Sequence, residues 1–139
     1  MFKRIMAPVD LAHLDKLERA LQVTAEEAKL HNAAVTYVSV SAAAPSALAH
    51  TPDEFKARLQ DFASKQALAH GINASSHAII SHDPTTDVDD ALLKCVSDTG
   101  ADLVIMASHR PGLADYFWPS NGGKIAAHTD ASVFIVRDA

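Results

Sequence analysis

One stretch decides the fold of this chain: Ala101-Asp102-Leu103-Val104-Ile105-Met106-Ala107-Ser108-His109-Arg110-Pro111-Gly112. Its apolar run, 103–107, is short and rich in β-forming residues, which is typical of a strand buried on both faces of a parallel sheet. A polar segment follows, and Ser120-Asn121 then precedes Gly-Gly-Lys-Ile-Ala-Ala-His, which indicates the start of a helix. Ligands bind parallel sheets where a strand's carboxyl end meets a helix N-terminus, because amide groups and the helix dipole attract anions there. This segment is therefore the first candidate for a functional site.

The bulk properties of the chain fit one domain, residues 1–139. The sequence is 48% hydrophobic and 21% charged, which is enough apolar material for a core. The net charge is −5, no run of Lys or Arg occurs, and no apolar run approaches the roughly 20 residues of a membrane span. With a single cysteine, Cys95, and no signal-peptide pattern after Met1, we expect a cytoplasmic protein that contacts neither nucleic acid nor membrane.

Strands and helices alternate along the sequence. Runs of β-forming residues predict strands over residues 3–9, 33–40, 75–81, 103–107 and 132–137. Apolar spacing predicts helices over residues 11–31, 52–70, about 87–100 and about 120–128. Thr51-Pro52-Asp53-Glu54 is a capping box with proline at the first helical position, and Asn32 and Gly71 stand where C-caps are expected. Residues 41–50 read as a mobile loop.

The alternation predicts a single doubly wound α/β domain. Helices between successive strands imply right-handed crossovers, a five-stranded parallel sheet and helices on both of its faces. In the helix over 11–31, one face is lined by Leu14, Leu17, Ala20, Leu21, Thr24, Ala25 and Ala28. The apolar residues of the helix over 52–70 are Phe55, Leu59, Phe62, Ala63, Leu68 and Ala69.

Several segments resemble the universal stress protein family. Ala7-Pro8-Val9-Asp10 matches the end of the family's first strand, and residues 101–109 with Ser120-Asn121 match its carboxyl-terminal signature. Residues 132–137 match its last strand. The resemblance covers the whole chain and implies an adenine nucleotide alpha hydrolase-like fold, with strand order 3-2-1-4-5, in a cytoplasmic dimer.

Many members of that family bind ATP through glycines after the fourth strand: Gly, two residues, Gly, nine residues, Gly, then Ser or Thr. This chain departs from the pattern, because Ala107, Arg110 and Pro119 stand at the glycine positions and the loop is one residue short. Pro119 removes one amide donor to phosphate, whereas Arg110 offers a charged fork that can bind it. Ala-Ser-His-Arg-Pro with a later Ser-Asn resembles a subgroup in which nucleotide binding tolerates Arg-Pro.

The resemblance implies a site for ATP or another adenine nucleotide, with or without Mg²⁺, at the carboxyl ends of the strands. Its candidate residues are Pro8, Asp10, Val40, Met106, Ala107, Ser108, His109, Arg110, Ser120 and Asn121. Asp10 either contacts the adenosine moiety or only caps the following helix. Val40 either flanks the base with its backbone or is simply a strand residue. Arg110 either binds phosphate or is a solvated surface arginine.

Three functions remain open at this point. The first is a stress-response regulator, not an enzyme, that binds an adenine nucleotide without efficient hydrolysis. The second is a dimeric scaffold that has lost the nucleotide, as the substituted glycine positions suggest. The third, a slow phosphohydrolase, is least favoured because no evident base or metal ligand accompanies Asp10. The eight histidines show no metal-binding spacing. In each case the apolar edge strand Val133-Phe134-Ile135-Val136 is expected to pair with its own copy in a two-fold dimer.

Overall fold

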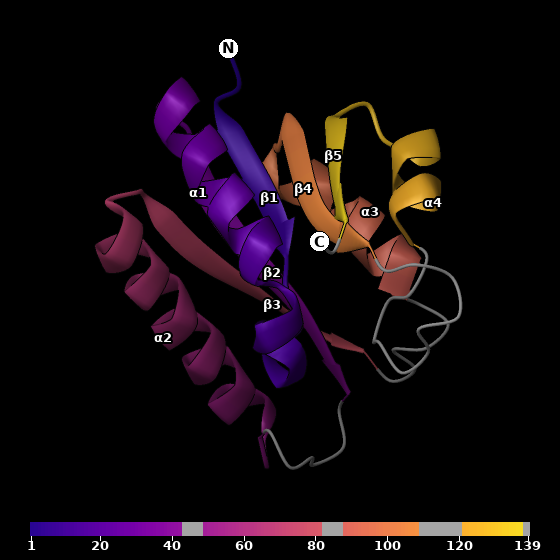
Figure 1. Ribbon diagram of the computed structural model, residues 1–139. Coiled ribbons are helices and arrows are strands. Elements are labelled where there is room, and N and C mark those ends of the chain that lie inside the picture. The colour runs from indigo at the N-terminus through magenta and orange to yellow at the C-terminus, as the bar shows by residue number, and fades with distance from the viewer. Residues whose placement is uncertain (43–48, 82–87, 109–120, 138–139) are drawn as a thin grey trace.

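The computed structural model describes residues 1–42, 49–81, 88–108 and 121–137. The strands are β1 (Arg4–Pro8), β2 (Ala34–Ala42), β3 (Ala74–Ser81), β4 (Leu103–Ser108) and β5 (Ser132–Arg137). The helices are the 3₁₀ helix η1 (Leu11–Lys16), α1 (Glu18–His31), α2 (Pro52–His70), α3 (Val88–Thr99) and α4 (Asn121–His128). Figure 1 shows the strands side by side in one twisted sheet, so the predicted doubly wound α/β architecture is confirmed.

The strand order is β3-β2-β1-β4-β5, and all four neighbouring pairs are parallel. β1 lies at the centre. It pairs with β2 along its whole length, from Arg4 to Pro8. With β4 it pairs only at Ile5–Leu103 and Met6–Val104. The two central strands are therefore not paired with each other towards their carboxyl ends.

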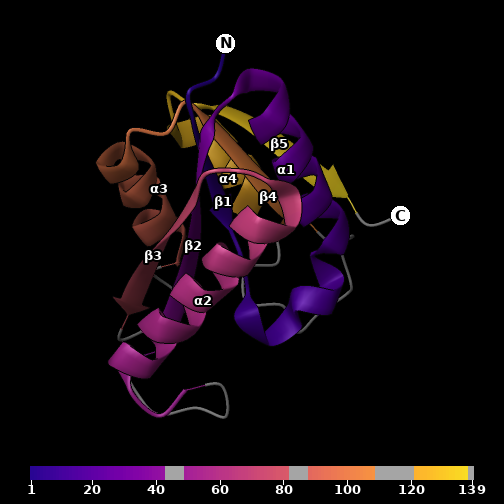
Figure 2. The same ribbon diagram turned by 90° about the vertical axis from the view of Figure 1, so that its left-hand side faces the viewer.

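Helices cover both faces of the sheet, α1 and α2 on one and α3 and α4 on the other (Figures 1 and 2). Successive strand residues point to opposite faces, so each strand supplies both cores. The core under α1 and α2 includes Ile5, Val35, Tyr37, Leu59, Leu103 and Ile105. The core under α3 and α4 includes Met6, Val38, Leu92, Cys95, Val104, Met106 and Ile125. No helix in the described ranges is long and apolar enough to cross a membrane.

The helix predicted over residues 11–31 is broken near its start. η1 ends at Lys16, α1 begins at Glu18, and His13 has φ −134° and ψ 43°, outside the helical region. Asp10 explains the break: its carboxylate accepts a hydrogen bond from the Ala12 amide at 3.0 Å and contacts His13 Nδ1 at 2.8 Å. These contacts hold residues 11–16 in a short 3₁₀ helix capped by Asp10, which is separate from α1. Asp10 is thus the N-cap of a short 3₁₀ helix.

The predicted helix C-caps are confirmed. Asn32 and Gly71 adopt the left-handed conformation, with φ of 53° and 64°, at the ends of α1 and α2. At the start of α2, Thr51 Oγ1 accepts from the Glu54 amide at 3.1 Å, as a capping box requires. The Glu54 carboxylate accepts in return from the His50 amide at 3.1 Å, one residue earlier than the standard motif.

One predicted boundary is wrong, and one helix buries less of its apolar surface than its composition indicates. β2 continues to Ala42, so residues 41 and 42 belong to the strand rather than to the predicted loop, and residues 43–48 lie outside the described part of the chain. On α2, Leu68 is 87% exposed and Ala69 is also exposed, while Phe55, Leu59 and Ala63 are buried. The buried stripe of α2 is therefore narrower than its apolar content suggests.

Asp102 fastens the amino terminus to the start of β4. Its carboxylate accepts hydrogen bonds from the backbone amides of Lys3, at 2.9 Å, and Arg4, at 3.0 Å. Burial raises the pKa of Asp102, but the backbone hydrogen bonds from Arg4 and Lys3 lower it by more. The pKa of this carboxyl group therefore lies below its usual value. The carboxylate therefore stabilises the register of β1 beside β4 in its ionised form.

Candidate functional site: the carboxyl ends of β1 and β4

The first candidate site lies where β1 and β4 end side by side. From β1 the chain continues into η1 and α1 on one face of the sheet, and after β4 it reaches α4 on the other face. The crossovers therefore diverge between these two strands. Open α/β sheets bind ligands at such a switch point, in the crevice beyond the strands' carboxyl ends. The short β1–β4 pairing, which stops at Met6–Val104, leaves the ends of the two strands free of each other.

Pro8 and Asp10 come from the β1 side of this point. Pro8 is buried and lies opposite Val38 of β2, so it fixes the direction in which β1 ends. The Asp10 side chain is only 14% exposed, and both of its oxygens already accept contacts from η1. A carboxylate oxygen has two lone pairs, so each can still accept from a ligand hydroxyl. The structure thus shows Asp10 as a cap and leaves it able to bind a ligand.

His13 is a residue of this region that the sequence reasoning missed. Its Nδ1 lies 2.8 Å from Asp10 Oδ2, and its side chain is 42% exposed. The signal was available, because a histidine three residues after an N-cap aspartate returns to the same side of a helical turn. The apolar spacing alone predicts one long helix with His13 on its polar side, and so does not single this residue out.

Met106 and Ala107 come from the β4 side and are 1% and 4% exposed. The Met106 side chain packs in the core under α3 and α4, and that of Ala107 in the core under α1 and α2. Val40 of β2 is likewise 5% exposed and packs in the core under α3 and α4. These three residues can present only backbone groups to a ligand. Ser108 ends β4 opposite Arg137 of β5.

The remaining predicted residues lie in the loop and at the start of α4. Asn121 is the first residue of α4. His109, Arg110 and Ser120 lie outside the described residues. The structure therefore brings together the β1 and β4 components of the predicted site and places the start of α4 after β4 in the chain. The parts assigned to phosphate binding by the sequence remain predictions.

An ion pair links α4 to α3, and the sequence reasoning did not predict it. Lys124 Nζ lies 3.4 Å from Asp89 Oδ2, and Ile125, the next residue, is 1% exposed in the core. The other Asp89 oxygen is buried without a hydrogen-bond partner in the described structure. The contact joins the first turn of α3 to α4. Within the described ranges, no group of three or more potential metal ligands occurs.

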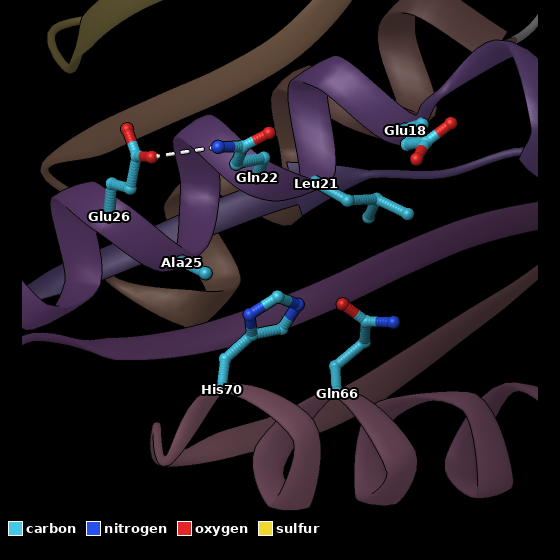
Figure 3. A pocket seen from close by; sticks show the side chains of 7 residues that line it. All are labelled: Glu18, Leu21, Gln22, Ala25, Glu26, Gln66 and His70. Carbon is cyan, nitrogen blue, oxygen red and sulfur yellow. Dashed lines mark hydrogen bonds between the residues drawn. The ribbon is translucent and has the colours of Figure 1, made fainter.

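A cavity of about 420 Å³ lies elsewhere, between α1 and α2 (Figure 3). Five of its lining residues come from α1: Glu18, Leu21, Gln22, Ala25 and Glu26. Two come from α2: Gln66 and His70. None of these residues was predicted to form a site. The α1 and α2 residues are more than thirty positions apart, and no local sequence pattern shows that they are neighbours in the fold.

Comparison with known proteins identifies the family. The chain matches the model of the universal stress protein family over residues 1–137. It belongs to the universal stress protein family. The match spans nearly the whole chain, and the resemblance inferred from the residues is thereby confirmed.

Solved structures of universal stress proteins share the fold of this universal stress protein. A universal stress protein in complex with cAMP has a TM-score of 0.70 and 18% identity, with 99% of each chain covered. One from Archaeoglobus fulgidus in complex with dAMP has a TM-score of 0.66 and 16% identity, with 96% of each chain covered. One from Arabidopsis thaliana with AMP bound has a TM-score of 0.65 and 14% identity, covering 99% of this chain and 92% of that one.

Proposed function

We propose that this universal stress protein binds an adenine nucleotide at the carboxyl ends of β1 and β4, as a regulator without efficient hydrolysis. The observation that carries the proposal is the end of β1–β4 pairing at Met6–Val104, with Asp10 just beyond it at the switch point of the sheet. Three universal stress proteins of the same fold hold cAMP, dAMP and AMP, which favours an adenine nucleotide over other anions.

Different residues contact the sugar, the base and the phosphates of the nucleotide. Asp10 accepts hydrogen bonds from sugar hydroxyls through its spare lone pairs, because a carboxylate is acceptor-only and ribose hydroxyls are donors. The backbone at the end of β2, from Val40, flanks the base. Arg110, with Ser120, Asn121 and the first amides of α4, receives the phosphates and replaces the amide that Pro119 lacks. Any Mg²⁺ is held mainly by the phosphates themselves.

Calorimetric titration with ATP, ADP, AMP and adenosine tests the proposal. We expect saturable binding of at least one nucleotide, with adenosine weaker than ATP because it lacks the phosphate contacts. Phosphate release followed over hours should remain close to that of nucleotide in buffer. Absence of binding heat at millimolar nucleotide would refute nucleotide binding, and rapid phosphate release would refute the regulator and favour the phosphohydrolase.

The second candidate function is a dimeric scaffold that acts by protein contact. It is favoured by the edge strand β5, on which Phe134 and Ile135 are 42% and 37% exposed. An apolar edge strand with free backbone groups pairs readily with another copy of itself. Val133 is only partly buried but packs against the core under α3 and α4, so Ile135 is the better position at which to test pairing. A dimer that binds no nucleotide would support the scaffold.

The proposed place of action is the cytoplasm. Cys95 is free and 2% exposed in the core, where a reduced thiol acts as a small apolar residue. Burial raises the pKa of its thiol to about 11, with the nearby Asp98 charge adding to the effect. The residue is therefore unreactive in the folded chain. Fractionation of cells that express the protein checks the location.

A further inference from the structure

We infer that His13 holds the Asp10 carboxylate in place for the two hydroxyl groups of a ribose, and so gives the nucleotide site a preference for ribose over 2′-deoxyribose. The inference rests on the proposed nucleotide site and gives a task to a residue that is not among the predicted contacts. Its basis is the distance of 2.8 Å between His13 Nδ1 and Asp10 Oδ2, just beyond the carboxyl end of β1. His13 acts through Asp10 and is therefore a positioning residue rather than a nucleotide contact.

The first turn of η1 is closed without the His13 side chain. Asp10 Oδ1 accepts a hydrogen bond from the Ala12 amide at 3.0 Å, and the Asp10 carbonyl accepts one from the His13 amide, also at 3.0 Å. The His13 side chain is 42% exposed, and a charged contact at such exposure stabilises a fold only slightly. The side-chain contact therefore adds little to the cap, and its main effect falls on the carboxylate itself.

The contact differs from an ordinary helix cap. η1 begins at Leu11, so His13 is the third residue of the helix, where the Glu or Gln of a capping box reaches back to the backbone amide of the N-cap residue. His13 reaches the N-cap side chain instead, from a backbone with φ −134° and ψ 43° that is not helical. Because an ionised carboxylate only accepts hydrogen bonds, His13 Nδ1 carries the hydrogen.

One donor holds each of the two Asp10 oxygens, Ala12 N–H on Oδ1 and His13 Nδ1–H on Oδ2. The terminal torsion of an aspartate is otherwise broad, so a donor on each oxygen fixes the plane of the carboxylate. Each oxygen keeps the capacity for a further donor. Only 14% of the Asp10 side chain is exposed, so an acceptor that a bound ligand covers without pairing is unfavourable there.

This arrangement matches a sugar with two neighbouring hydroxyl groups. The 2′- and 3′-hydroxyls of ribose can donate one hydrogen bond to each fixed oxygen, whereas 2′-deoxyribose has a donor for only one. A universal stress protein of the same fold holds dAMP, so the fold itself does not require a 2′-hydroxyl. A preference for ribose must therefore come from residues of this chain, and the Asp10–His13 pair supplies it.

The test is calorimetric titration of the full chain with AMP and with dAMP, which differ only in the 2′-hydroxyl. For the wild type we expect AMP to bind about tenfold more tightly, the effect of one hydrogen bond to a charged acceptor. His13→Leu should reduce this ratio to about threefold or less, because the carboxylate is no longer fixed. His13→Asn should restore most of the ratio, because asparagine is similar in size to leucine and its amide N–H lies close to the position of the imidazole Nδ1–H.

Two further variants separate positioning from a general loss of stability. In an Asp10→Ala background, AMP and dAMP should bind alike and His13→Leu should have no further effect on the ratio, because the two residues act as one unit. His31→Leu removes a second histidine–carboxylate contact, that of His31 Nε2 with Glu27 Oε2 at 3.2 Å. It lies at the far end of α1, where the His31 ring contacts Phe2 before β1, and should leave the ratio unchanged.

The wild type gives two measurements that need no variant and that decide even if a variant fails to fold. In the nucleotide-free protein, ¹⁵N NMR of the imidazole should show a hydrogen on His13 Nδ1, and a hydrogen on Nε2 alone would overturn the inference. AMP and dAMP affinities within about twofold of each other, or a preference that survives His13→Leu, would also overturn it while leaving the proposed nucleotide site intact. A wild type that binds neither nucleotide would overturn the proposed function and this inference together.

Discussion

Replacement of Asp10 by alanine separates capping from ligand binding. The variant loses the N-cap bond to Ala12, which contributes about 1 kcal/mol. It also loses the contact with His13, whose side chain is 42% exposed, so this contact contributes only about 0.2–1 kcal/mol. The free energy of unfolding should therefore fall by about 1–2 kcal/mol. If the carboxylate also binds nucleotide, the dissociation constant should rise tenfold or more, since a hydrogen bond to a charged group contributes about 1.5–3 kcal/mol.

Urea unfolding followed by circular dichroism measures the first effect, and calorimetric titration of the folded variant measures the second. Asp10→Asn is the matched control, because asparagine caps as well as aspartate but carries no charge. It should retain most of the stability and still bind nucleotide more weakly. A dissociation constant of Asp10→Ala within twofold of the wild-type value would refute the ligand role of Asp10 and leave only its role as a helix cap.

The remaining predictions concern four other positions. Arg110→Ala should weaken ATP and ADP by about tenfold in calorimetry and leave adenosine nearly unaffected. If β5 pairs two copies as proposed, Ile135→Asp should give a monomer in light scattering, whereas Leu68→Asp, at an 87% exposed position of α2, should leave that dimer intact. Asp102→Asn should lower the free energy of unfolding at pH 7 by about 1 kcal/mol. Because the folded pKa of Asp102 is depressed, that difference should shrink in urea titrations as the pH falls below about 3.9 and through the folded value. Cys95 should resist iodoacetamide at pH 8 until urea unfolds the chain, because burial shields its thiol and raises its pKa to about 11.

Local patterns in the sequence were enough to predict the sheet and most helix ends. The buried strand over 103–107 and the apolar edge strand over 132–137 both read as short apolar runs, so each could be placed almost to the residue. Caps are encoded by single residues, and Asn32 and Gly71 stand where the left-handed conformation is needed. The strand order came from the family resemblance, since periodicity does not specify which strands are neighbours.

Features that depend on contacts across the fold were not predictable in the same way. The break at His13 arises because Asp10 captures two groups of the next turn, while the apolar spacing of Leu14, Leu17 and Leu21 continues through it. Leu68 is exposed because α2 buries only a narrow stripe, Phe55, Leu59 and Ala63, and which apolar residues of a helix meet the sheet depends on tertiary packing. Of the candidate site, residues 8–10, 40 and 106–108 are described, and the phosphate-binding loop is a prediction from the sequence alone.

The pairing of β1 with β4, which Asp102 reinforces through Lys3 and Arg4, has a consequence for synthesis of the protein. Of the five strands of this sheet, β1 is made first and lies at the centre, but its partner β4 begins about a hundred residues later. Until β4 has left the ribosome, one side of β1 is an unpaired edge with the apolar residues Ile5 and Met6. Nascent chains that end before residue 103 therefore expose an unpaired apolar strand edge, which favours association with chaperones or with other chains. Completion of the sheet waits for the last third of the chain.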